Sequence, residues 1–149
     1  MKSLYEKETI AQCIMRIETL QPESKALWGK MSVNQMLDHC SVGMETIRDQ
    51  RHIKRVWISY LIGGLLKKFF YNEKPFKQNT PTAKEFIITN PHEFEVAQQT
   101  LINHLKAIDS EGPAKCTKHP HAFFGNLTPE QWGKGMYKHL DHHLQQFGV

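Results

Sequence analysis

The C-terminal stretch from Thr128 to Val149 constrains the fold most, because it combines clear helix boundaries with a helical apolar period. Thr128 and Gln131 have the spacing of a capping box, and Pro129 takes the first helical position, where its missing N–H costs nothing. Gly148 is placed to end the helix. Apolar side chains recur at three- and four-residue intervals in between, so one face of this helix should be buried. Other elements of the chain must cover that face.

Two histidines on this predicted helix are the first candidates for chemistry. His139 and His143 are separated by one turn and fall inside or beside the apolar stripe. Two imidazoles at positions i and i+4 can chelate one metal ion. The same pair is also compatible with hydrogen-bonded histidines in a core. A metal site therefore requires a third donor from another element.

Length and composition bound the class of protein. A chain of 149 residues with 40% hydrophobic and 23% charged residues predicts a single globular domain over residues 1–149. Three cysteines without a CxxC motif, and a polar N-terminus without a signal-peptide core, predict a cytoplasmic protein. The longest apolar run, 56–66, is far shorter than the roughly 20 residues of a membrane span, so no transmembrane segment is expected.

Three further segments have the apolar period of helices, about 3–20, 32–49 and 90–109, and a fourth helical segment, 54–71, is apolar almost all round. Ser32 and Gln35 form a second capping box, and Asn90 before Pro91 has the pattern of another helix start. The intervening stretches read as long loops, with an extended piece at about 86–89. No pair of strands is evident. The sequence therefore predicts an all-α fold, a four-helix bundle with up to five helices and long loops.

His39 on the second predicted helix is the best third donor. It falls on the shoulder of the apolar stripe, and Gly43 lies one turn away, which removes bulk beside the imidazole. Packed helices lie about 8–10 Å apart, a distance that two side chains can span to reach a common metal. Three imidazoles with an open coordination position are typical of a catalytic site. The alternative role of Gly43 is close helix packing alone.

Other histidines are candidates for supporting roles. His142 lies off the stripe and is the candidate catalytic residue, either as a proton shuttle or as a hydrogen-bond partner of a ligand. A solvated histidine at the helix edge is the alternative. His119 and His121 lie in the loop before the last helix and could form part of the site wall, and His104 is one more possible donor. Trp28, in the first loop, is expected to plug the core.

The acidic residues of the two ligand-bearing helices are predicted to face outward: Asp38, Glu45, Glu130 and Asp141. A catalytic base is therefore not expected among them. A metal-bound water or a metal-bound thiolate would take that role. Cys40 falls inside the apolar stripe and reads as a small buried residue.

Basic residues are concentrated between Arg51 and Lys77. This segment holds seven lysines and arginines and one acid, a net charge of +6 that leaves −2 for the rest of a chain whose total is +4. The favoured interpretation is that these charges solubilise the apolar segment 54–71, which should sit deep in the bundle or form a homodimer interface. An anionic partner is the alternative, and no nucleic-acid motif accompanies the segment.

Three motifs resemble a known superfamily: QMLDH at 35–39, HPHAFFGNLTPEQW at 119–132 and KHLDHHLQQFGV at 138–149. From about Ile17 to its end the chain is similar to the DinB/YfiT-like helical-bundle metalloenzymes, in a branch of unknown function that ends in a His-rich helix with QFG. The resemblance implies metal ligation by His39, His139 and His143. It also implies nickel, zinc or iron, and, in some members, transfer reactions that use a low-molecular-weight thiol such as bacillithiol, mycothiol or glutathione.

Two functions follow as hypotheses. In the first, the three histidines hold one divalent metal that activates water or a thiol for hydrolysis or group transfer on a small-molecule substrate. In the second, the histidines are structural and the bundle binds a small molecule or lipid without catalysis. A third, lower-ranked reading places the basic segment on a membrane surface or nucleic acid, with binding that weakens steeply with salt.

Overall fold

The computed structural model describes residues 1–149 and contains five α-helices, two single-turn 3-10 helices and no sheet. This architecture confirms the predicted all-α fold. The elements in chain order are α1 (Lys7–Glu18), α2 (Val33–Ile47), α3 (Ser59–Tyr71), η1 (Lys84–Phe86), α4 (Phe94–Glu111), η2 (Pro113–Lys115) and α5 (Pro129–Gln146).

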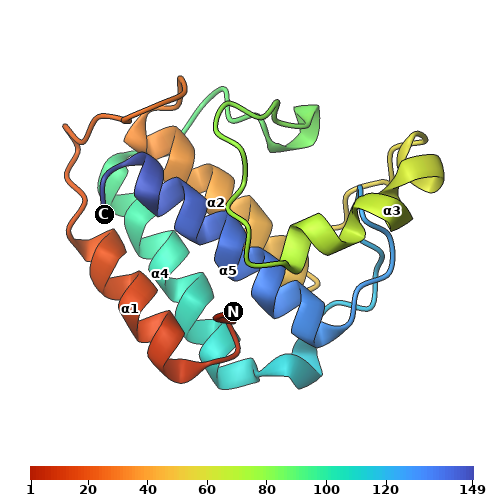
Figure 1. Ribbon diagram of the computed structural model, residues 1–149. Coiled ribbons are helices and arrows are strands. Elements are labelled where there is room, and N and C mark those ends of the chain that lie inside the picture. Colours follow the sequence, from red (N-terminus) through yellow and green to blue (C-terminus); the bar gives the residue numbers. More distant parts are fainter.

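Four of the helices, α1, α2, α4 and α5, pack into the bundle (Figure 1). Helix α2 lies between α4 and α5, and α1 closes the bundle by packing on α4 and α5. Their apolar faces meet in one core, and its centre is formed by side chains with no exposed surface, among them Leu37, Leu101 and Leu140. The stripes predicted on these helices are therefore the surfaces that bury apolar area and hold the bundle together.

Both predicted capping boxes are present. The Ser32 hydroxyl accepts the backbone N–H of Gln35, and the Gln35 side chain accepts the backbone N–H of Ser32. Thr128 and Gln131 repeat this exchange at the start of α5. Gly148 follows the last turn with φ of 78°, a left-handed conformation that glycine adopts without strain. These local signals fix where α2 and α5 begin and where α5 ends.

Helix α4 starts later than the sequence indicated. Asn90 does not cap it; α4 begins at Phe94, and the chain before it is held against α2 instead. The backbone N–H of His92 donates to the Asp38 carboxylate at 2.8 Å, and the His92 carbonyl accepts the side-chain amide of Asn34 at 2.9 Å. These long-range bonds satisfy the segment outside a helix. The local Asn-Pro signal is overridden by tertiary contacts.

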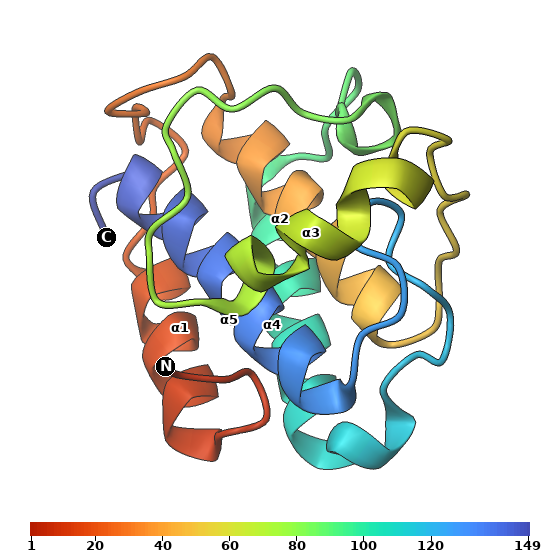
Figure 2. The same ribbon diagram turned by 45° about the vertical axis from the view of Figure 1, so that its right-hand side comes forward.

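Trp28 and most of helix α3 lie outside the core. Trp28 is only half-buried and packs beside the ring of His142 rather than plugging the core. Helix α3 is not deep in the bundle: among the helices it packs mainly on α5, and its N-terminal end projects away from the other helices (Figures 1 and 2). No helix combines the length and the apolar character required to cross a bilayer.

The anchor of α3 is its inner face. Phe70 is buried and packs where Gly135 leaves room on α5, since a Cβ there would lie 2.0 Å from the Phe70 ring. Gly63 lies against the backbone of Phe123, whose carbonyl oxygen would be 2.2 Å from a Cβ added at Gly63. The extended piece predicted at 86–89 is present in part: Phe86 ends the single turn η1, and the backbone is extended at Ile87.

Candidate metal centre

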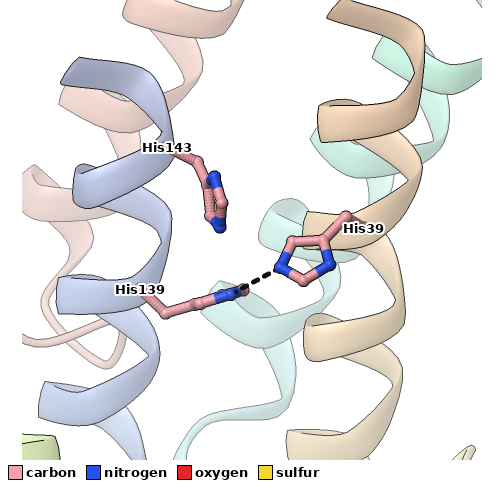
Figure 3. Close-up of side chains that lie close together, drawn as sticks. All are labelled: His39, His139 and His143. Atoms are coloured by element: carbon pink, nitrogen blue, oxygen red, sulfur yellow. Dashed lines mark hydrogen bonds between the residues drawn. The ribbon is translucent and has the colours of Figure 1, made fainter. Parts of the chain in front are cut away.

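Three histidines from two helices meet in the bundle. His39 comes from α2, and His139 and His143 come from α5, one turn apart (Figure 3). The Nε2 atoms of His39 and His139 are 2.9 Å apart, and one nitrogen from each of the three rings lies within 4.8 Å of the other two. The structure thus brings together the three residues that the sequence singled out as metal ligands.

The orientation of the His39 ring is fixed by a backbone carbonyl. Its Nδ1 lies 3.0 Å from the carbonyl oxygen of Phe86, which can only accept a hydrogen bond. Nδ1 therefore carries the proton, and in the neutral ring Nε2 presents a lone pair toward the other two histidines. A histidine that donates its outer N–H to a carbonyl is the usual arrangement of a metal ligand.

The His143 ring is oriented by Gln146, one turn further along α5. The Gln146 amide nitrogen donates to the carbonyl of Trp28 at 2.7 Å, so its oxygen faces His143. That oxygen accepts from His143 Nδ1 at 2.8 Å, which leaves Nε2 of His143 unprotonated. Two of the three rings thus have the same proton assignment, each set by an acceptor outside the cluster.

His139 differs, because its Nδ1 is buried without a hydrogen-bond partner. Nε2 of His39 has no proton, so His139 Nε2 donates the hydrogen bond between them and its Nδ1 is left bare. Buried polar atoms are rarely left unpaired. The cluster is therefore not a complete hydrogen-bonded network, as histidines with a purely structural role would be expected to form.

Gly43 sets the spacing between the helices at this level. A Cβ at this position would lie 2.7 Å from the methyl group of Met136 and 3.5 Å from Nδ1 of His139. The missing side chain leaves room for the methyl group of Met136, whereas the His139 ring would be in ordinary van der Waals contact with an added Cβ. Gly43 therefore serves close packing of α2 on α5 beside the cluster.

Burial keeps the three imidazoles neutral. It lowers the pKa of His39, and it lowers that of His143 to about 3. The pKa of His139 is well below its ordinary value, first because of burial and then because the neighbouring histidines oppose a positive charge. Neutral imidazole is the form that binds a metal, so no ring has to lose a positive charge at pH 7. On His139 the proton would have to move from Nε2 to Nδ1 for Nε2 to bind a metal.

The donor set fits a divalent transition metal. With metal–nitrogen bonds of about 2.0–2.1 Å, neighbouring ligand nitrogens lie roughly 3.0–3.4 Å apart. The 2.9 Å between His39 and His139 is close to this range, and the 4.8 Å limit on the third nitrogen requires only a small ring movement. Three imidazoles without a carboxylate suit zinc, nickel or iron better than magnesium or calcium.

A cavity of about 270 Å³ opens onto all three rings. Its apolar walls come mainly from four aromatic side chains: Phe70, Phe76, Phe86 and Phe124. His121 also lines it, as predicted for the last loop, and burial lowers its pKa to about 4. Lys77 is the one charged residue in the lining, which contains no acid. The cavity can therefore hold a small, partly apolar molecule next to the three histidines.

His142 lies at the rim of this cavity. Its ring centroid is 5.3 Å from that of His143, and the rings of Trp28 and Phe76 flank it. Burial lowers its pKa. It also borders a second cavity of about 440 Å³ that reaches Gln146. His142 is therefore near the cluster without joining it, which fits the predicted supporting position.

The remaining histidine candidates lie elsewhere. His119 pairs with His52 beside Asp49 at the surface, where all three residues are exposed. His104 lies 2.9 Å from a guanidinium nitrogen of Arg48. Neither one reaches the three-histidine cluster.

None of the four acids expected on the outer faces approaches the cluster. Glu45, Glu130 and Asp141 form ion pairs with basic residues away from it. Asp38 departs from its predicted exposure, because it is buried against His92. Cys40 is fully buried, as predicted, and burial raises the pKa of its thiol.

Sequence reasoning missed two groups that orient the ligands. Gln146 had a usable signal, since it lies three residues after His143 and so shares its side of the helix. The Phe86 carbonyl had none. It is a backbone atom 47 residues from His39, and no side-chain pattern reports it.

The fold and the site define a class: a helical bundle with a buried three-histidine cluster that can hold a metal ion, open to a small cavity. No curated protein and no solved structure matched the chain. A family model does match it over residues 5–148, so the chain belongs to DUF1569, a family described as protein of unknown function.

Proposed function

We propose that this protein binds one divalent metal ion through His39, His139 and His143 and uses it to act on a small molecule. The observation that carries the proposal is the orientation of the rings. Carbonyl oxygens hold the outer nitrogens of His39 and His143, so both rings present lone pairs toward His139. The unpaired Nδ1 of His139 argues against a self-contained structural network.

A divalent metal held by three imidazoles would keep open positions where it lowers the pKa of bound water or of a thiol. The reaction class proposed is therefore hydrolysis or thiol-dependent transfer. The aromatic walls would bind the apolar part of the substrate, and the absence of an acid in the cavity lining removes carboxylates as the base. His142 and His121 border the cavity and would exchange protons with the bound molecule.

The resemblance of the three histidine-bearing motifs to DinB/YfiT-like metalloenzymes points the same way. We propose that DUF1569 is a branch of that superfamily, with nickel, zinc or iron as the metal and a low-molecular-weight thiol as a possible co-substrate.

Metal content tests the proposal directly. Untagged protein, purified without chelator and analysed by mass spectrometry, should carry about one equivalent of metal. His39→Ala and His139→Ala should lose it, whereas His119→Ala, which alters an exposed ring outside the cluster, should retain it. Far-UV circular dichroism establishes that each variant is folded.

An absence of metal in folded wild-type protein, even after incubation with nickel, zinc and iron, would refute the proposal. The histidines would then be structural, and the cavity would be that of a non-catalytic binding protein. If metal is present, loss of thiol transfer or ester hydrolysis in His139→Ala, measured over a panel of small electrophiles, would identify the reaction class.

A further inference from the structure

The outer face of α3 is the main concentration of exposed apolar surface. Seven of the eleven large hydrophobic side chains that are exposed lie between residues 57 and 69. The most exposed are Leu65 at 80%, Trp57 at 75% and Leu61 at 68%. A contiguous apolar surface of this kind usually marks an interaction site.

The exposed side chains follow the helical spacing. Leu61, Leu65 and Phe69 recur every four residues of α3 and so form one stripe, and the exposed Trp57 lies in the turn just before the helix. The opposite side of the helix is anchored, since Phe70 and Gly63 pack on α5 and on the last loop. The packing of the inner side of α3 therefore leaves the stripe on its opposite side exposed to solvent, on a helix that lies at the edge of the bundle (Figure 2).

Unpaired cations lie before, within and after α3 along the chain. Lys54 precedes α3, Lys68 lies in its last turn, and Lys74 and Lys77 follow it; all four are exposed, and none forms an ion pair. Glu73 is the single acid between residues 51 and 77. Exposed aromatic and aliphatic side chains thus occur together with free positive charge at both ends of α3, from Lys54 and Lys68.

We propose that this surface, formed by the stripe of α3 with Lys54 and Lys68 at its ends, docks on an anionic lipid surface. An interfacial helix buries its apolar face among the acyl chains while lysines at its edge meet anionic headgroups. A second copy fits less well, because a two-fold contact through α3 would bring Lys54 and Lys68 of both copies together without acids to pair with them. Charge complementarity therefore favours the lipid surface.

Vesicle co-sedimentation tests this proposal. The metal-free protein is mixed with vesicles of phosphatidylcholine alone, or with roughly a third of phosphatidylserine. We expect at least tenfold stronger partitioning onto the anionic vesicles, because each lysine near such a surface contributes about fivefold. Binding should weaken as salt is raised from 0.05 to about 0.5 M. Trp57 emission should shift to shorter wavelength on binding.

Matched variants locate the surface. The pair Lys54→Glu and Lys68→Glu should reduce partitioning by more than tenfold. The pair Lys25→Glu and Lys106→Glu changes the net charge equally at exposed positions off α3, and it should leave binding within about twofold of wild type. Leu61→Ser with Leu65→Ser tests the apolar part, with Met15→Ser and Val96→Ser as its control.

Three outcomes would overturn the proposal. An equal loss of vesicle binding in both charge-reversal pairs would show that binding depends on net charge alone. A dimer in analytical ultracentrifugation that Leu61→Ser and Leu65→Ser dissociate, without vesicle binding, would assign the surface to a second copy. Absence of binding in a monomer would leave no lipid role. Each result is independent of the three-histidine site, since His139→Ala should bind vesicles as wild type does.

Discussion

Gln146 determines which nitrogen of His143 faces the cluster. Its amide has one donor end and one acceptor end, and the Trp28 carbonyl takes the donor end. The acceptor end must then receive the His143 Nδ1 proton. Asp or Glu at this position would supply a charge as well, whereas glutamine sets the ring orientation without adding charge to a buried site.

Gln146→Leu should therefore weaken metal binding without removing a ligand. The His143 ring would lose its outer partner, and its proton could move to Nε2, where it blocks coordination. We expect roughly 10- to 100-fold weaker affinity, the usual effect of losing such a partner. Competition titration with a chromophoric chelator measures it. Gln145→Leu, on the exposed side of the same turn, is the control, and equal affinity in both variants would contradict the assignment.

At the scale of elements, α3 is held to the bundle by the fit of the Phe70 ring over Gly135. A Cβ at Gly135 would lie 2.0–2.4 Å from three atoms of that ring, and an aromatic ring cannot bend away as a flexible chain can. Gly64, on the open side of α3, has nothing within 4 Å of an added Cβ. Alanine substitutions at Gly135 and Gly64 therefore report separately on packing and on helix propensity.

Gly135→Ala should destabilise the protein by about 1–3 kcal/mol, because overpacking outweighs the gain in helix propensity. Gly64→Ala should stabilise it by up to about 1 kcal/mol, since alanine favours the helix and meets no neighbour. Urea denaturation followed by circular dichroism measures both. Stabilisation by Gly135→Ala would mean that Phe70 does not anchor α3.

The predictability of each element depended on whether its determinants are local. Capping boxes at Ser32 and Thr128 exchange bonds over three residues, and the sequence predicts them correctly. The start of α4 depends on Asp38, more than 50 residues away, and was predicted wrongly. For the segment 54–71 the sequence left two alternatives, and the structure excludes the position deep in the bundle. An apolar segment avoids water, but its composition does not identify what covers it.

The candidate site shows the same division. The i, i+4 spacing of His139 and His143 is local, and the stripe on α2 put His39 on the correct helix face. Which loop atom holds His39 depends on the path of residues 72–90 over the bundle. That path has no periodic pattern, so the Phe86 carbonyl could only be found in three dimensions.

At the scale of the whole molecule, the metal-free protein buries several histidines that must stay neutral. Burial lowers the pKa of His143 to about 3 and that of His121 to about 4, below the value of about 6.5 in an unfolded chain. Between these values the unfolded state binds more protons than the folded state. Stability is therefore complete above about pH 6.5 and is lost as the pH falls toward 4.

The free energy of unfolding of the chelator-treated protein should accordingly fall on acidification from pH 7 to pH 5. Each histidine contributes a slope of up to about 1.4 kcal/mol per pH unit, so His121 and His143 together remove roughly 4 kcal/mol. Urea denaturation at each pH gives the slope. His121→Phe should reduce this slope by the contribution of about one proton, even if the substitution also changes the free energy of unfolding at pH 7. His119→Gln, which changes an exposed ring, should keep the wild-type slope; equal slopes in all three proteins would contradict the burial of neutral His121.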